Sequence, residues 1–384
     1  MRVRALSLAI ATAASLAAAA PACAEAGQEP FRLLRGLQAL QGRVAAGDDK
    51  AQKAQPELLR AIGRSIAAAS EAAWEDPRNV RAVLLYALSG GGPEPLRRLK
   101  ARGTDRIPPA LLEGAIAFTE GRNEAARKAL AGIDPLALPA GTGGHIALVK
   151  AMVEEAADPA AADRLLDVAR LLSPGTLIEE AALRRQAVLA SGRGDYDRFA
   201  FLSGQYFRRF RHSAYAPAFL PQFAAAVVGF EFPMIASAER PIVSIIAGLD
   251  TGTRRALYLA IARAAAISGK ADHAILTADR AAALSGPGTA ERARADLYAA
   301  AVLIATEAYD LGIGKLAGVD AALLGSADRD LLRAATALSA RLREWPADAP
   351  AGALPAEGQG PDPDLAVRGK KAVAEADALL ASLQ

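Results

Sequence analysis

The sequence has 384 residues, of which 45 are Lys or Arg and 42 are Asp or Glu, giving a formal net charge of +3. Hydrophobic residues make up 52% of the chain, which excludes intrinsic disorder because disorder requires low hydrophobicity and high net charge. A single Cys excludes a disulfide-stapled module. About a quarter of the residues are Ala and only 5% are aromatic, a composition that favours helices over sheets.

Residues 1–24 have the features of a secretory signal peptide. Two arginines precede an uncharged stretch over residues 5–20, and Ala22 and Ala24 form the small-residue pattern that a signal peptidase recognises. We therefore expect cleavage after Ala24; the alternative is a lipoprotein cleaved before Cys23. Cleavage after Ala24 would leave 43 basic and 42 acidic residues, and a chain so close to neutral gives no electrostatic reason to expect nucleic-acid binding.

Apolar residues recur every three or four positions along most of the chain, which predicts amphipathic helices. The first two apolar stripes cover residues 31–44 and 58–66. Asp76 and Pro77 predict the start of a further helix, with Asp as the N-cap and Pro at the first helical position, and residues 90–93 (Gly-Gly-Gly-Pro) predict its end. No stretch of comparable length alternates with period two, so we predict an all-α protein.

From about residue 108 the predicted helices form pairs separated by short turns. The expected pairs are 111–119 with 124–130, 145–155 with 160–172, 177–190 with 195–210, and 257–267 with 271–284. The first helices of the first three pairs start at intervals close to the tetratricopeptide period. We therefore predict a tetratricopeptide-like helical-hairpin solenoid over residues 25–345, in which abundant Ala allows paired helices to approach closely.

The longest uncharged run after the leader covers residues 213–230 and is interrupted by Pro217 and Pro221. It is too short to span a membrane, and we predict a helix buried in the core, with an apolar docking surface as the alternative. Residues 346–364 are rich in Pro and Gly and are predicted to form a linker or a disordered tail. Residues 365–384 are predicted to form a short, loosely amphipathic helix.

A search for catalytic or metal-binding patterns finds none in the sequence. The three His lie in different segments, no cluster has zinc-ligand spacing, and no nucleophile elbow or phosphate-binding loop is present. Gly312 and Gly314 are predicted to form a hairpin turn, and the adjacent carboxylates Glu179 and Glu180 are expected to be solvated. We expect no enzymatic activity, no cofactor and no bound metal.

The segment from Tyr206 to His212 interleaves arginines with aromatic residues. Such a pattern can bind an acidic partner, because guanidinium groups form charge-assisted hydrogen bonds with carboxylates. The predicted partner-binding residues are Tyr206, Arg208, Arg209 and Arg211. The alternative is the amphipathic end of a helix, in which Phe residues pack inward and Arg residues interact favourably with the helix dipole.

Several strings resemble the MotC family of periplasmic motility proteins of alphaproteobacteria: FRLLRGLQALQGRVAAGD from Phe31, WEDPRNVRAVLLYALSGG from Trp74, DRLLDVARLLSPGTLIEEAAL from Asp163, and the later QYFRRFRHSAYA and ALYLAIARAA. The likeness extends over about residues 30–345. We expect the chain to be shorter than typical members, with the Pro/Gly-rich segment in place of an extended ordered C-terminal region.

The resemblance implies a periplasmic protein required for flagellar rotation that associates with the periplasmic part of the stator protein MotB. The resemblance assigns no binding or catalytic role to individual residues. We expect no small-molecule substrate, and the apolar runs of the sequence are too short for membrane insertion. The alternative function is a tetratricopeptide-like adaptor for cell-envelope assembly that has no role in motility.

Overall fold

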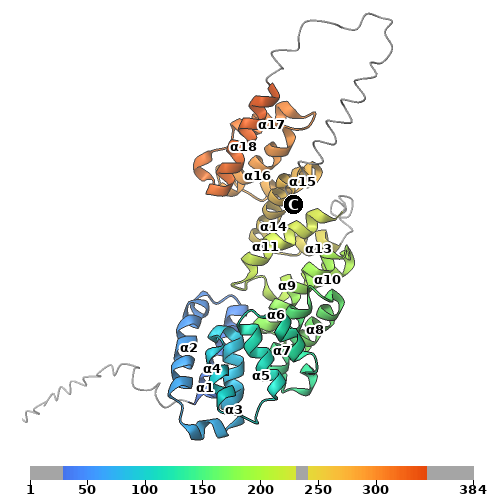
Figure 1. The fold of residues 1–384 in the computed structure, drawn as a ribbon. Helices are drawn as coiled ribbons and strands as arrows, with labels where there is room; N and C mark the ends of the chain where they lie inside the picture. The colour runs from blue at the N-terminus through green and yellow to red at the C-terminus, as the bar shows by residue number, and fades with distance from the viewer. Residues whose placement is uncertain (1–28, 231–240, 344–384) are drawn as a thin grey trace, which may run out of the picture. The chain divides into compact units, whose positions relative to one another are not determined.

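The computed structural model describes residues 29–230 and 241–343, and every regular element in these ranges is helical (Figure 1). The prediction of an all-α protein is therefore confirmed. The chain divides into two units, residues 1–332 and 333–384. The predicted signal peptide, the Pro/Gly-rich segment over 346–364 and the helix over 365–384 lie outside the described residues.

The first unit begins with four helices that surround one hydrophobic core: α1 (Pro30–Ala45), α2 (Asp49–Ala68), α3 (Pro77–Tyr86) and α4 (Glu94–Ala101). Short helical turns connect them, η2 (Glu71–Glu75) and η3 (Ala87–Gly91). The predicted start of α3 is confirmed, because the Asp76 side chain accepts a hydrogen bond from the Arg78 amide at 2.8 Å. The predicted stop is also confirmed: Gly90 has φ +105°, a conformation that favours glycine.

Three helix pairs follow, as predicted, and the members of each pair lie side by side (Figure 1). They are α5 (Pro109–Thr119) with α6 (Asn123–Leu130), α7 (Ala140–Glu154) with α8 (Pro159–Leu172), and α9 (Leu177–Gly192) with α10 (Tyr196–Phe210); η4 (Pro135–Ala137) precedes α7. The first helices begin at residues 109, 140 and 177, so the intervals are 31 and 37 residues and less regular than expected. The tetratricopeptide-like detail stays a prediction.

The remaining elements are α11 (Ala216–Gly229), α13 (Pro241–Ala247), α14 (Thr251–Ile267), α15 (Ala271–Ala283), α16 (Ala290–Leu303), α17 (Tyr309–Ala317), η5 (Ala321–Leu323) and α18 (Ser326–Arg343). Helix α14 packs on α15 and α15 packs on α16. The uncharged run forms α11, where Phe219, Phe223 and Val227 are fully buried, so the predicted core helix is confirmed. Within residues 29–230 and 241–343, no helix combines the length and apolar character needed to cross a bilayer.

Small residues set the distance between packed helices, as the sequence predicted. The core shared by α7, α8 and α9 contains five buried alanines, Ala147, Ala151, Ala162, Ala169 and Ala182.

The predicted hairpin turn at Gly312 and Gly314 is wrong, because both residues lie inside α17. A Cβ added at Gly312 would come within 2.7 Å of the Ile304 backbone nitrogen, so this glycine permits close packing rather than a turn.

Candidate functional site

The structure separates the predicted partner-binding residues into buried and exposed groups. Tyr206 lies inside α10 and is fully buried, and its hydroxyl donates a hydrogen bond to Glu180 Oε1 at 3.1 Å. It therefore belongs to the core and is not available at the surface. Arg208, Arg209 and Arg211 are exposed.

Phe207 and Phe210, which alternate with these arginines, are buried in an aromatic cluster that includes Phe219 and Phe223. The ring centroids of Phe207 and Phe223 lie 5.1 Å apart, edge to face. This packing agrees with the alternative interpretation of the segment, in which the aromatic residues face inward. The partner-contact role of the three exposed arginines stays a prediction.

The expectation that Glu179 and Glu180 are solvated is wrong, because both side chains are buried. Glu179 accepts hydrogen bonds from the guanidinium of Arg209 and from the Gly175 amide, the latter at 2.6 Å. Glu180 accepts from Tyr206 and from the Ser213 hydroxyl, the latter at 2.8 Å. Burial raises the pKa of Glu180 above its ordinary value. Apart from Gly175, these partners lie 26 to 33 residues away in sequence, so helical periodicity could not reveal them.

The exposed arginines differ in whether they already form an ion pair or a hydrogen bond. Arg209 is paired with Glu179, and Arg211 Nε lies 3.0 Å from Nε2 of His212. Arg208 forms no ion pair with any residue that the structure describes. Arg211 and His212 line a cavity of about 540 Å³ between the start of α2, the end of α10, α11 and the start of α14.

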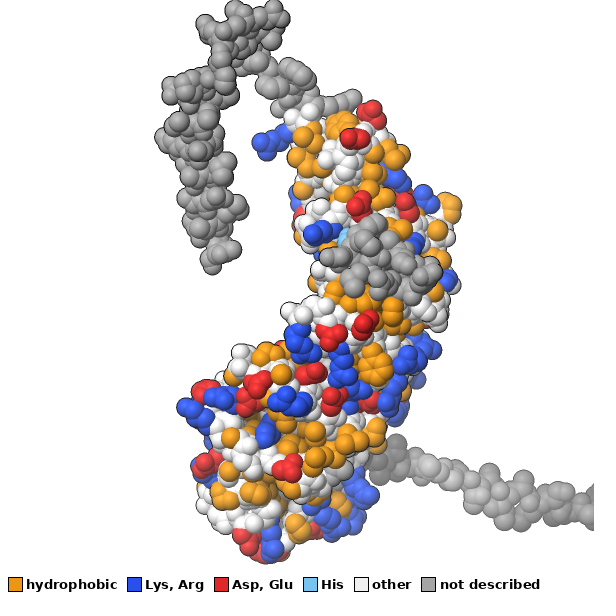
Figure 2. Space-filling view, turned by 90° about the vertical axis from the view of Figure 1, so that its right-hand side faces the viewer, with side chains coloured by type: hydrophobic (Ala, Val, Ile, Leu, Met, Phe, Trp, Pro, Cys, Tyr) orange, Lys and Arg blue, Asp and Glu red, His pale blue; other side chains and the backbone are white. Residues whose placement is uncertain are grey.

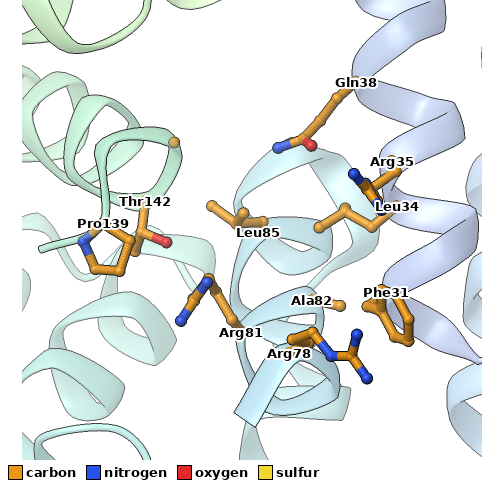
Figure 3. Close-up of a pocket in the computed structure, with 11 residues that line it drawn as sticks. Phe31, Leu34, Arg35, Gln38, Arg78, Arg81, Ala82, Leu85, Pro139 and Thr142 are labelled. Carbon is orange, nitrogen blue, oxygen red and sulfur yellow. The ribbon is translucent and has the colours of Figure 1, made fainter.

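A second cavity, which the sequence did not predict, lies between α1, α3 and the start of α7 (Figure 3). We call it the basic pocket. Its volume is about 370 Å³, and it is lined by Phe31, Leu34, Arg35, Gln38, Arg78, Arg81, Ala82, Leu85, Pro139, Gly141 and Thr142.

Asn79, which is fully buried, fixes the start of α1 against α3 on one side of the basic pocket. Its Oδ1 accepts from the Phe31 amide at 3.1 Å, and its Nδ2 donates to the Ala73 carbonyl at 2.9 Å. Arg78 bonds Asp76 at 2.6 Å and places its guanidinium 4.1 Å from the centroid of the Phe31 ring. The hydrogen bonds with Arg78 lower the pKa of Asp76, so this pair remains ionised at neutral pH.

The other two arginines of the basic pocket, Arg35 and Arg81, form no ion pair with any described residue. Thr142 is only 4% exposed, and its hydroxyl makes no hydrogen bond within the described part of the chain. Figure 3 shows the Gln38 amide, the Arg81 guanidinium and the Thr142 hydroxyl extending into the space between α1, α3 and the start of α7. The pocket thus offers hydrogen-bond donors and positive charge beside an apolar wall.

A neighbouring cavity of about 310 Å³ shares Gln38 and Gly141 with the basic pocket and extends along α1 toward the start of α9. His145 lines it, and its Nδ1 lies 2.8 Å from the Gly141 carbonyl oxygen. Burial lowers the pKa of His145, so the ring is neutral at pH 7. The two cavities therefore adjoin at Gln38 and Gly141.

Basic and acidic side chains are not segregated on the face of the molecule drawn in Figure 2. They are interspersed there with exposed hydrophobic side chains. In the described ranges no group of three or more His, Cys, Asp or Glu is arranged to hold a metal ion. The basic pocket is distinguished by arginines that form no ion pair with a described residue.

Sequence reasoning missed the basic pocket because its walls come from three separate segments. The available signal was Arg78 and Arg81, which are three residues apart and so share one face of the helix that begins at Pro77. The spacing of residues in the sequence does not indicate that this face of the helix lies near Arg35 and Thr142.

Comparison with known proteins identifies the family of this chain. Residues 1–382 match the family model described as Chemotaxis protein MotC. A curated relative, "Chemotaxis protein MotC" of Rhizobium meliloti (strain 1021), is 32% identical over 334 residues, which cover 84% of this chain and 75% of the relative. No solved structure matches the chain. The chain belongs to the chemotaxis protein MotC family.

Proposed function

We propose that this protein is a non-enzymatic accessory of the flagellar motor that is required for flagellar rotation. The observation that carries the proposal is the match to the MotC family model over residues 1–382. A further support is the 32% identity to a chemotaxis protein over most of both chains. Within the described residues, the sites are surfaces and pockets with unpaired donors, which suits a protein that acts by binding.

In this proposal the protein is exported to the periplasm, where it associates with the periplasmic part of the stator protein MotB. The arginines over residues 2–4, the uncharged stretch that follows and the Ala22-x-Ala24 pattern support export. N-terminal sequencing of the protein recovered from the periplasmic fraction should begin at Glu25. A chain that retains residues 1–24 and stays in the cytoplasmic fraction would contradict the export step.

The test of function is an in-frame deletion scored in soft agar and by electron microscopy. We expect cells that carry normal flagella but do not swim, and restoration of swimming by the gene supplied in trans. Normal swimming of the deletion strain would refute the motility role and favour an adaptor in envelope assembly. Cells without filaments would also contradict the proposal, since they would place the protein in flagellar assembly.

The association with MotB has its own test, in which the purified protein is mixed with the periplasmic part of MotB. We expect the two to co-elute in size-exclusion chromatography. Arg208→Glu and Arg211→Glu reverse two of the exposed charges in the predicted partner-binding segment and should weaken this complex. Arg329→Glu is the matched control, because Arg329 is exposed, lies on α18 and has no ion pair with a described residue. Equal binding by all three variants would remove the segment from the interface.

A further inference from the structure

The basic pocket contains more positive charge than its surroundings neutralise. Of its three arginines, Arg78 is paired with Asp76, whereas Arg35 and Arg81 have no acidic partner among the described residues. Among the described residues, no carboxylate lines the pocket. A guanidinium group in such a setting is a ready partner for a carboxylate, with which it can form two parallel hydrogen bonds.

A second feature of the pocket is independent of the arginines. The Thr142 hydroxyl, although 96% of the residue is buried, has no hydrogen-bond partner within the described residues, and it faces the pocket (Figure 3). Most buried polar side chains in proteins are satisfied, so an unsatisfied hydroxyl at a cavity wall marks a place where a ligand atom completes the bonding. Thr142 also lies in the first turn of α7, where the helix dipole favours negative charge and no side chain caps the helix.

Apolar side chains also line the basic pocket, on the same two helices, α1 and α3, that carry its arginines (Figure 3). Phe31, Leu34 and Leu85 line the same cavity, and Phe31 is held in place by the hydrogen bond from its amide to Asn79. A ligand that fills the basic pocket must therefore present an acidic group and an apolar group close together. A neighbouring cavity of about 310 Å³ adjoins the basic pocket at Gln38 and Gly141, so a peptide chain that leaves the pocket on this side reaches a second hollow.

We propose that the basic pocket binds an acidic peptide segment of a protein partner, in which a carboxylate contacts Arg35, Arg81 and Thr142. An adjacent aliphatic side chain of the segment packs against Phe31, Leu34 and Leu85. This inference rests on the proposed function in one respect, namely that the occupant of the pocket is a protein partner. The carboxylate preference of the pocket follows from its own residues.

The test is isothermal titration calorimetry of the full mature chain with a short blocked peptide of alternating Asp and Leu. A matched peptide of alternating Asn and Leu keeps the shape but lacks the charge. We expect binding of the acidic peptide, no detectable binding of the amide peptide, and weaker binding at high ionic strength. Binding of both peptides with similar affinity would overturn the carboxylate assignment, and binding of neither would overturn the site.

Variants locate the site on the chain. Arg35→Gln and Arg81→Gln should each weaken binding of the acidic peptide by about tenfold or more, the loss expected for one charge-assisted hydrogen bond. Thr142→Val, which keeps the side-chain shape and removes the hydroxyl, should weaken it by a smaller factor. Arg329→Gln removes an exposed, unpaired arginine outside the pocket and should leave the affinity unchanged. Equal affinity of all four variants would place the peptide elsewhere and refute the proposal.

Two further outcomes separate this inference from its alternatives. Concentration-dependent self-association that disappears in Arg35→Gln would identify a second copy of the chain as the occupant and overturn the assignment to a partner. Peptide binding that depends on Arg35 and Arg81, in a protein whose deletion leaves swimming normal, would retain the pocket and refute only the motility role. Each variant should keep the wild-type circular dichroism spectrum, because the substituted arginines are at least partly exposed and Val has the same shape as the buried Thr142.

Discussion

Tyr206→Phe tests whether the buried Glu180 depends on donors supplied by α10 and the segment that follows it. The substitution removes one oxygen atom and leaves the ring, whose centroid lies 4.5 Å from that of Phe219, in place. Glu180 Oε1 then loses the hydrogen bond from the tyrosine hydroxyl, while Oε2 keeps the bond from Ser213 at 2.8 Å. The buried carboxylate is left half satisfied in a site that water does not reach.

The expected cost depends on pH because burial raises the pKa of Glu180 above its ordinary value of 4.5. The folded protein thus holds the proton more tightly than the unfolded chain, so the contribution of this group to stability is complete below pH 4.5 and is lost as pH rises through the folded pKa. A hydrogen bond to a charged group contributes about 1.5–3 kcal/mol and one between neutral groups about 0.5–1.5 kcal/mol. Tyr206→Phe should therefore cost more at pH 8 than at pH 5.

The assay is urea denaturation followed by circular dichroism at both pH values, with equal slopes required for the comparison. Tyr258→Phe is the control, because Tyr258 is buried and its hydroxyl makes no hydrogen bond with a described residue. The control should change the unfolding free energy by less than about 0.5 kcal/mol. A Tyr206→Phe variant that matches the control at both pH values, or that loses more stability at pH 5, would refute this account of the Glu180 site.

Four further substitutions test the packing and capping of the helices by thermal and urea denaturation. Phe223→Ala empties a fully buried position in the aromatic cluster and should destabilise the fold by about 3–5 kcal/mol; a loss below 1 kcal/mol would contradict the described core. Gly312→Ala should cost about 1–3 kcal/mol because its Cβ would meet the Ile304 backbone, whereas Gly314→Ala, with open space around it, should stabilise α17 by up to about 1 kcal/mol. Reversal of that order would show that the two glycines were assigned to the wrong faces. Thr289→Ala removes the N-cap of α16 and should cost about 1 kcal/mol, and an unchanged midpoint would show that this cap does not stabilise the helix.

The basic pocket and the predicted partner-binding segment are two separate surfaces, and variants can distinguish them. The pocket is lined by residues of α1, α3 and the start of α7, whereas the exposed arginines Arg208 and Arg211 lie at and just beyond the end of α10. The pocket binds through unpaired donors in a concave site, which favours a defined peptide. The arginine segment has a mixed surface in which Arg209 is already paired with Glu179.

Local signals in the sequence sufficed to place most helices. The N-cap of α3 was predicted from Asp76 and Pro77, and the stop from the glycines that follow residue 89, because capping depends on residues within one turn. Apolar periodicity likewise predicted the core face of α1, where Leu34 and Leu37 are buried. The alanines between paired helices were also visible as composition before their contacts were known.

The sequence failed where a residue's environment is decided by a distant segment. Glu179 and Glu180 look like surface residues in the sequence, yet both are buried. Their hydrogen-bond donors Arg209, Tyr206 and Ser213 belong to the next helix and to the residues after it. Tyr206 was placed at the surface for the same reason, since its exposure depends on how α10 packs against α9 and α11.

The sequence by itself determined the helical class, the pairing of neighbouring helices and the family. Periodicity and capping depend on residues that are close in sequence, and family similarity is a property of the sequence itself. Only the tertiary structure decided which charges are paired and which donors remain free. Arg78 and Arg35 look alike in the sequence, yet one bonds Asp76 and the other faces an open cavity without an acidic partner among the described residues. The reason is physical: the energy of a charge depends on the groups within a few ångströms of it, and in this fold those groups come from segments far apart in sequence.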